Sequence, residues 1–221
     1  MIVLRNPIEI LYADKEYIVF NKPAGLLVIP SPKKETDTLV HRVNKQLESS
    51  VRLYPCHRLD RETSGIIVFA KGKHNQQLMM EAFKRRQVKK EYIAFIQGRI
   101  TRKSGEIKSI IHNPFDQHFR KHSSGRLAIS RYKVVEIRKH FSIVEVEPIT
   151  GRTNQIRIQF KEMGHPLVGE RKYAFARDYP LKFRRVALHA QVFECVQPVT
   201  QREIYISCRL PKDMQEFLGK N

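Results

Sequence analysis

The sequence predicts an α+β fold built around a mixed or mostly antiparallel sheet, and three observations lead to this prediction. Short runs rich in apolar and β-branched residues recur along the whole chain, whereas runs with helical periodicity are few. The two kinds of run do not alternate regularly, as they would in a doubly wound parallel sheet. Of the 221 residues, 41% are hydrophobic, so the chain can bury a sizeable core and is not a disordered polycation.

The N-terminal half shows four runs of β-prone residues and two runs of helical period. Strands are expected at Ile8–Tyr12, Tyr17–Phe20, Ile66–Ala70 and Glu91–Gln97. Helices are expected at Asp37–Leu47 and His74–Arg86, because apolar residues in both recur three and four positions apart. Between the second strand and the first helix, Asn21–Gly25 contains both proline and glycine, which is typical of a turn.

The C-terminal half is predicted to be richer in strands. They are expected at Ile107–His112, Ala128–Ile137, Phe141–Glu147, Val186–Phe193 and Ile204–Cys208. The segment Asn154–Met163 fits both periods, but Gly164 directly after it favours a helix that ends there. A short helix is expected at Asp213–Leu218, near the end of the sequence.

The charge of the chain points to a polyanionic partner. Lys and Arg total 41 against 22 Asp and Glu, which gives a formal net charge of +19. Nucleic acid is the leading candidate, an anionic membrane surface is the second, and a protein that is merely basic stays an alternative. The basic residues are spread along the chain, which fits a groove for a phosphate backbone better than a single membrane anchor. No apolar run approaches the length of a membrane-spanning helix, and the N-terminus does not resemble a secretory signal.

Cysteine and histidine give no sign of a disulfide framework or a metal site. Cys56, Cys195 and Cys208 are odd in number and widely spaced, which favours a reducing cytoplasm. His112, His118 and His122 share one polar segment, but their spacing matches no zinc pattern. We therefore expect no metal.

The segment His57–Gly65, with the sequence HRLDRETSG, is the most informative stretch for chemistry. It places Asp60 in a polar turn just before a buried strand. Arg58 and Arg61 on either side should hold this carboxylate ionised, because nearby positive charge favours the anion. From the residues alone Asp60 could be a nucleophile, a general base, a metal ligand or one half of a surface ion pair.

Five stretches of the sequence carry recognisable motifs. They are Asn21–Val28 (NKPAGLLV), His57–Lys71 (HRLDRETSGIIVFAK), Lys90–Tyr92 (KEY), Thr150–Arg157 (TGRTNQIR) with Gly164–Gly169 (GHPLVG), and Leu188–Ala190 (LHA) followed by Leu210–Pro211. Together and in this order they resemble the RluA-type pseudouridine synthases, which isomerise uridine in ribosomal or transfer RNA. The resemblance implies the pseudouridine synthase fold, with an active cleft across the central sheet, in a single catalytic domain over residues 1–221. It leaves no room for a separate N-terminal RNA-binding domain.

The resemblance also implies roles for three catalytic residues. Asp60 matches the essential aspartate, acting either as nucleophile or as the base that removes the 2′ proton. Tyr92 matches the tyrosine that stacks on uracil and helps to deprotonate C5. Arg157 matches the basic residue that pairs with the catalytic carboxylate. Because the reaction needs no redox change and no group donor, no cofactor is expected.

A stacked base must be flipped out before it can react, and Arg58 matches the family position that fills the gap left behind. The implied RNA contacts are His57, Arg58, Arg61, Thr63, Lys90, Arg152, Asn154 and Gln155. Asn154 stands where relatives commonly have histidine, and we expect only a local adjustment from this change. The expected partner is a stem-loop of ribosomal or transfer RNA, bound by a monomer in the cytoplasm.

Two other functions remain open at this level. One is an RNA chaperone that keeps the fold without catalysis, although Asp60, Tyr92 and Arg157 are all present. The other is a metal-dependent nuclease that uses Asp60 and Glu62 as a carboxylate pair.

Overall fold

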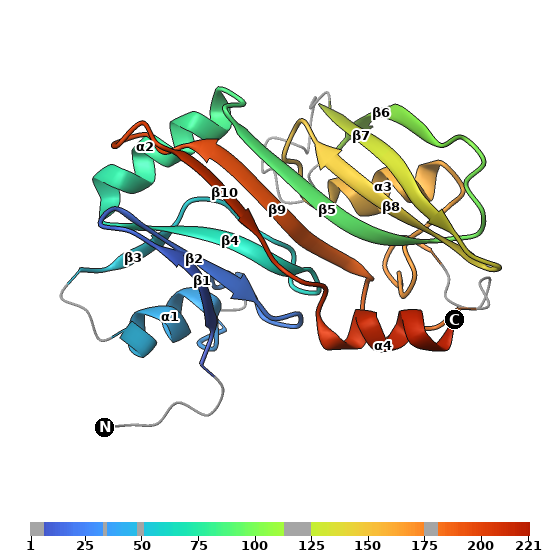
Figure 1. Cartoon of the computed structure of the whole chain (residues 1–221), viewed down its shortest axis with the longest axis horizontal. Coiled ribbons are helices and arrows are strands. Elements are labelled where there is room, and N and C mark those ends of the chain that lie inside the picture. Colours follow the sequence, from blue (N-terminus) through green and yellow to red (C-terminus); the bar gives the residue numbers. More distant parts are fainter. Residues whose placement is uncertain (1–6, 33–34, 48–50, 113–124, 175–180) are drawn as a thin grey trace. The chain divides into compact units, whose positions relative to one another are not determined.

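The computed structural model describes residues 7–32, 35–47, 51–112, 125–174 and 181–221 (Figure 1). The chain divides into two compact units, and every statement below concerns the described residues of one unit at a time. The first unit comprises Met1–Lys90 and His189–Asp213, and the second comprises Glu91–Leu188 and Met214–Asn221. The single catalytic domain over residues 1–221 stays a prediction.

The first unit contains a mixed sheet with helices packed against it. Its strands are β1 (Glu9–Ala13), β2 (Tyr17–Lys22), β3 (Leu53–Pro55), β4 (Ser64–Lys71), β9 (Leu188–Val196) and β10 (Glu203–Ser207). The order is β1-β2-β4-β9, with β3 paired to β4 and β10 paired to β9. All pairs are antiparallel except β4 with β9, which are parallel. The sheet is therefore mixed, as the sequence predicts.

Two helices complete the first unit, and both follow the predicted apolar period. They are α1 (Leu39–Leu47) and α2 (Lys73–Lys84). Leu39 and Val43 of α1 are fully buried, and Met79 and Ala82 of α2 join Val68 and Ala70 of β4 in one core cluster. Helix α2 thus covers one face of β4, the strand that follows the loop carrying Asp60.

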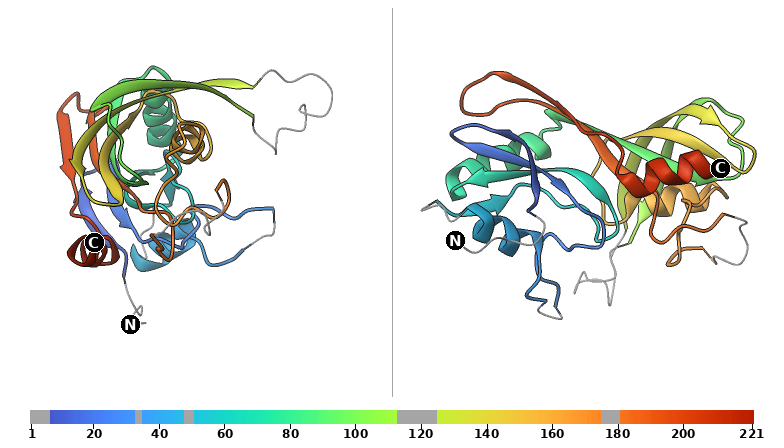
Figure 2. Two further views of the ribbon diagram at one scale, coloured as in Figure 1. Left: turned by 90° about the vertical axis from the view of Figure 1, so that its right-hand side faces the viewer. Right: turned by 60° about the horizontal axis from the view of Figure 1, so that its bottom comes forward.

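The second unit is an antiparallel sheet with α3 on one face (Figure 2). Its strands run in the order β5-β8-β7-β6, where β5 (Val88–Gln97) continues from the first unit. The others are β6 (Ser104–Ile111), β7 (Arg126–Ile137) and β8 (Phe141–Pro148), and the helices are α3 (Gln155–Glu162) and α4 (Lys212–Lys220). Phe217 of α4 packs its ring against Phe95, Phe141 and Phe183, so the last helix closes the aromatic core of this unit.

The α+β prediction is confirmed, and the ambiguous segment after Asn154 is a helix. Gly164 has a φ of 79°, a left-handed backbone conformation that glycine adopts without strain, just beyond the end of α3. Strand β3 was not predicted, because three residues are too few to show a period. His118 and His122 lie outside the described residues. Within the described chain, no helix has the length and apolar character needed to cross a membrane.

Candidate active site

The loop between β3 and β4 carries Asp60 in the first unit. The Cys56 amide donates to the carbonyl of Val68 at 2.9 Å, which fixes the start of the loop to β4. At the other end, the Thr63 amide donates to the Asp60 carbonyl at 3.1 Å and closes a tight turn. Leu59 is buried, whereas Asp60 itself is half-buried. The loop therefore presents a carboxylate that has limited freedom of movement.

The turn after β2 supports this loop from a distant part of the sequence. The carbonyl of Arg61 accepts hydrogen bonds from the Gly25 amide at 2.8 Å and from Lys22 Nζ at 3.2 Å. In return, Arg61 Nε donates to the carbonyl of Gly25 at 3.0 Å. Lys22 is fully buried, and its ammonium also donates to the carbonyls of Pro23 and Leu26. These contacts hold the Asn21–Val28 motif against the loop that bears Asp60.

The close approach of β4 and β9 explains why glycine follows the loop. Gly65 has a φ of 111°, and a Cβ at this position would lie 2.2 Å from the carbonyl oxygen of Ala190. Beside it, Ser64 Oγ lies 2.9 Å from His189 Nδ1, and Cys208 Sγ lies 3.1 Å from His189 Nε2. This buried cluster ties the start of β4 to the C-terminal strands, which accounts for the motif at Leu188–Ala190.

His57 lies beneath the loop and accepts a hydrogen bond. The Val68 amide donates to His57 Nε2 at 3.1 Å, which assigns the proton of the neutral ring to Nδ1. The ring packs on Phe83, and the ammonium of Lys90 lies 5.3 Å from the centre of the Phe83 ring. Burial, together with the charge of Lys90, lowers the pKa of His57 to about 3. Burial also lowers the pKa of Lys90 to about 8. His57 is thus a neutral packing residue of the loop.

Arg58 and Arg61 differ in what they contact. Arg58 is exposed, and its guanidinium makes no hydrogen bond or ion pair within the described part of the chain. Arg61 is also exposed, but it is engaged by Gly25 as described above. Thr63 is 1% exposed, and its hydroxyl has no hydrogen-bond partner among the described residues. Arg58 and Arg61 are thus exposed and Thr63 is buried, and the RNA contacts expected of all three stay predictions.

In the second unit, Tyr92 and Arg157 both occupy buried positions. Tyr92 lies on β5, opposite Val146 of β8, and is 7% exposed. Arg157 projects from the first turn of α3 and forms a two-pronged ion pair with Glu170, at 2.7 Å from both Nε and Nη2. The pairing of Arg157 with Asp60 that the resemblance implies joins residues of different units and stays a prediction.

Glu170 is the carboxylate that sequence reasoning missed. Besides Arg157, it accepts hydrogen bonds from three successive amides, of Arg171, Lys172 and Tyr173. Burial alone would raise the pKa of Glu170, but the hydrogen bonds and charge of Arg157 and the backbone amides lower it below its usual value. Glu170 is therefore ionised and holds the Arg157 guanidinium in one orientation. Its place directly after the motif Gly164–Gly169 was the available signal.

The turn before α3 is held by Gln155. Its Oε1 accepts from Thr150 Oγ1 at 2.7 Å and from the Arg152 amide at 3.0 Å. Its Nε2 donates to the Ile129 carbonyl at 2.9 Å and to Ser130 Oγ at 2.8 Å. All four hydrogen-bonding positions of this buried amide are occupied within the protein, so Gln155 fixes the turn, and its expected RNA contact stays a prediction.

Asn154 adopts a left-handed conformation at the start of α3, with a φ of 55°. Its Oδ1 accepts from Arg157 Nη1 at 3.1 Å. Asparagine and histidine are both enriched in this backbone region, and both offer an acceptor, which explains how one replaces the other here. Arg152 is half-exposed, and its Nε donates to the carbonyl of Leu127 at 3.2 Å.

The remaining titratable groups of the described residues offer no second candidate for a catalytic cluster. Burial raises the pKa of the thiols of Cys56, Cys195 and Cys208 to about 12, so each stays protonated. No group of three or more His, Cys, Asp or Glu side chains that could hold a metal ion occurs in the part of the chain that the structure describes.

Comparison with known proteins agrees with the motifs. Residues 16–162 match the family model described as RNA pseudouridylate synthase. The chain is 32% identical to ribosomal large subunit pseudouridine synthase D of Blochmanniella floridana, over 96% of this chain and 72% of that protein. It is also 32% identical to tRNA pseudouridine synthase C of Haemophilus ducreyi, over 96% of this chain and 95% of that protein.

The fold has a similar solved structure. It is Human RNA Pseudouridylate Synthase Domain Containing 4, with a TM-score of 0.78 and 27% identity over 96% of this chain and 92% of that chain.

Proposed function

The chain belongs to the RNA pseudouridylate synthase family, and from this premise we propose that Asp60 converts specific uridines of ribosomal or transfer RNA into pseudouridine without a cofactor. The observation that carries the proposal is the anchoring of the Asp60 loop. The start of the loop is bonded to β4, the Thr63 amide closes a tight turn on the Asp60 carbonyl, and Arg61 is bonded to Gly25 and Lys22, so the backbone that carries Asp60 is held on both sides. A rigid loop that holds the Asp60 carboxylate in place suits a reaction that needs an accurately positioned side chain and no donated chemical group.

The reaction is an isomerisation and balances within the uridine. The bond between N1 of uracil and C1′ of ribose breaks, the ring turns, and a new bond joins C5 to C1′. The proton that leaves C5 is balanced by the proton that N1 gains. No electron acceptor and no donated group is required, so the chain's own side chains are sufficient.

Asp60 can act in either of two ways. As a nucleophile, its carboxylate attacks C1′ and is displaced when C5 bonds to that carbon. As a base, it removes the proton from C2′ while N1 departs, and returns it after the new bond forms. Substrate RNA with deuterium at C2′ separates the two routes, because only removal of that proton gives a primary isotope effect on turnover.

Tyr92 and Arg157 support the chemistry from the second unit. Tyr92 stacks on the uracil and helps to remove the C5 proton, which we infer from its place in the Lys90–Tyr92 motif and its near-complete burial. Arg157 stabilises the anionic form of the catalytic carboxylate, and its guanidinium is already oriented by Glu170 and Asn154. The Tyr92→Phe variant should lose turnover while its RNA affinity stays within about tenfold.

Arg58 provides the group that replaces the flipped base. Unstacking one base costs a few kcal/mol, and a planar guanidinium inserted into the gap recovers part of this energy by stacking. Arg58 is exposed and has no described partner that would have to be given up. The Arg58→Ala variant should therefore lose activity on structured RNA more than on an unpaired oligonucleotide.

The test is a pseudouridine assay on cellular RNA in EDTA. We expect pseudouridine in intact RNA from the wild type, and none from Asp60→Asn although RNA binding persists. Asp37→Asn, which makes the same chemical change in an exposed ion pair with Arg42, is the matched control and should keep full activity. Intact RNA without pseudouridine would favour an RNA chaperone, and cleavage that requires Mg²⁺ would favour a nuclease.

The RNA partner, the monomeric state and action in the cytoplasm are further parts of the proposal. Ribosomal and transfer RNA both occur in the names of the relatives, so the choice between them is made by mapping modified sites in cells that lack the protein. Binding should weaken steeply with added salt as counterions are released, and a flat response would count against a phosphate-lined surface. Sedimentation of the free protein tests the monomer.

A further inference from the structure

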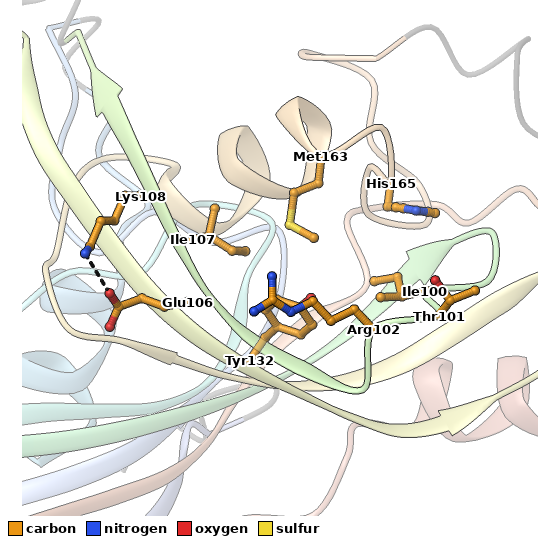
Figure 3. Close-up of a pocket in the computed structure, with 9 residues that line it drawn as sticks. All are labelled: Ile100, Thr101, Arg102, Glu106, Ile107, Lys108, Tyr132, Met163 and His165. Atoms are coloured by element: carbon orange, nitrogen blue, oxygen red, sulfur yellow. Dashed lines mark ion pairs between the residues drawn. The ribbon is translucent and has the colours of Figure 1, made fainter.

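The second unit contains a pocket that none of the assigned residues uses (Figure 3). Its volume is about 440 Å³, within the range of small-molecule sites. Ile100, Ile107 and Met163 supply apolar surface, and the ring of Tyr132 adds an aromatic wall. Strands β6 and β7 form one side of the pocket, and the loop between β5 and β6 and the turn after α3 form the rest.

Among the described residues, two polar groups of the pocket have no hydrogen-bond partner. Tyr132 is only 6% exposed, yet its hydroxyl makes no hydrogen bond within the described residues. His165 Nδ1 lies 3.0 Å from the carbonyl of Gln97, which requires the proton on Nδ1 and leaves Nε2 of the neutral ring as an acceptor. The pocket thus offers a hydroxyl, which donates and accepts, and a ring nitrogen, which accepts. Such a pair can read the polar edge of a planar ring.

The rim of the pocket carries an excess of positive charge. Glu106 is the carboxylate that lines it, and it is paired with Lys108 at 3.1 Å and with Arg131 at 3.4 Å. Hydrogen bonding and charge from Lys108 lower the pKa of Glu106, so it is ionised at neutral pH. Arg102 adds a third cation, and its Nε donates to the carbonyl of Ser104 at 3.1 Å. Arg102 and Lys108 line the pocket and Arg131 pairs with Glu106 beside it, so positive charge exceeds the one carboxylate and favours an anionic ligand.

We propose that this pocket binds one unpaired nucleotide of the substrate RNA, other than the target uridine. The base lies against Met163 and the Tyr132 ring, its polar edge meets the Tyr132 hydroxyl and His165, and its phosphate meets Arg102. Base stacking on an aromatic wall tolerates different bases, and a basic rim holds the backbone of a single strand. The inference rests on the proposed function in so far as the RNA is the enzyme's substrate. It adds a second point at which RNA is held.

The methionine methyl group at the pocket gives a direct readout. The chain has five methionines, and Met163 is the one that lines this pocket. Full-length protein with ¹³C-labelled methionine methyl groups is titrated with uridine 5′-monophosphate, with a short oligouridine and with inorganic phosphate, and Met163→Leu assigns the signal. We expect a saturable shift of Met163 with the nucleotide and the oligouridine, the oligouridine binding more tightly, and little shift with phosphate.

Two variants and one control test the assigned contacts. Tyr132→Phe removes only the hydroxyl, Arg102→Gln removes the rim charge together with the hydrogen bond to Ser104, and each should weaken the Met163 titration about tenfold. Arg99→Gln makes the same change at an exposed arginine of the same unit that does not line the pocket, and should alter binding by less than twofold. Equal effects of Arg99→Gln and Arg102→Gln would show that the nucleotide is held by general charge attraction and not by this pocket, and would overturn the proposal.

The remaining outcomes separate this inference from the proposed function. Asp60→Asn should give the same Met163 shift as the wild type, because the pocket does not depend on catalysis. Pseudouridine formation without any Met163 shift at saturating RNA would overturn the pocket and leave the function intact. A shift with the free nucleotide that RNA does not produce would show a site for a small metabolite. Displacement of the oligouridine by an acidic peptide of equal charge would show that contacts to the base contribute nothing to binding, and this result would also overturn the proposed nucleotide site.

Discussion

His57 makes the stability of the first unit sensitive to mild acid. Its neutral ring accepts the Val68 amide, and its pKa falls from 6.5 to about 3 because burial and the charge of Lys90 disfavour the protonated form. Between pH 6.5 and pH 3 the unfolded chain therefore binds more protons at this site than the folded chain. The free energy of unfolding rises with pH across this window and is lost as the pH falls through it.

The size of the effect follows from the difference between the two pKa values. Each pH unit within the window changes the free energy of unfolding by about 1.4 kcal/mol, so a change from pH 7 to pH 5 removes about 2 kcal/mol. Because the ring of His57 keeps some exposed surface, this figure is an upper one. It is nevertheless large beside the net stability of about 5 to 15 kcal/mol of a typical protein.

The perturbation is His57→Gln, and the assay is urea unfolding at pH 7, 6 and 5. Glutamine can still accept the Val68 amide but has no proton to gain, so the variant should lose less stability on acidification than the wild type. The difference in free energy of unfolding between the wild type and His57→Gln should shrink by about 2 kcal/mol from pH 7 to pH 5. His74→Gln makes the same change at an exposed histidine of α2, and carboxylates that titrate in the same range cancel in the comparison. Parallel curves for wild type and His57→Gln would refute the reasoning, as would an NMR titration of His57 centred near pH 6.5.

Three other substitutions test the supports of the site, the first two by urea unfolding and the third by activity and RNA binding. Gly65→Ala should cost about 3 kcal/mol or more, because its φ is positive and the new Cβ would meet Ala190, whereas Gly219→Ala, with open space around it, should be neutral or slightly stabilising. Glu170→Gln should cost about 3 kcal/mol because it removes one charge of a buried two-pronged ion pair with Arg157, whereas Glu81→Gln in an exposed pair should cost under about 0.5 kcal/mol. Lys22→Met should release the turn from Arg61, so the rate of pseudouridine formation should fall more than RNA affinity does. An equal fall in both would show that Lys22 serves RNA binding.

The sequence predicted most elements because their periods are strong and their ends carry glycine. The helix after Asn154 is the clearest case, since two periods competed and Gly164 decided between them correctly. Strand β3 was not predicted because it forms by pairing with β4, and the local sequence pattern does not reveal this pairing. Sequence reasoning relies on the apolar period of an element and on the glycine or proline that bounds it, and a strand of three residues is too short to show a period.

The candidate site was predicted less completely, and the reason is burial. Lys22 and Gln155 stand in quoted motifs, but a sequence does not show whether a polar side chain faces solvent or the chain's own carbonyl groups. Both form hydrogen bonds within the protein. Glu170 was missed for the same reason, since its ion pair with Arg157 joins residues 13 positions apart. Contacts of this kind depend on how the loops fold back.

The net charge of +19 therefore overstates the charge that RNA can reach. Lys22, Arg157 and Arg185 are at least 90% buried and donate to carbonyl or carboxylate oxygens within the protein. Replacing a buried cation lowers stability without changing the number of phosphates that the surface neutralises, so the salt dependence of RNA binding should keep its slope in any such variant that still folds. Replacing an exposed cation such as Arg58 or Arg102 should reduce that slope by about one. Cations that build the site and cations that hold the RNA can be separated by this difference alone.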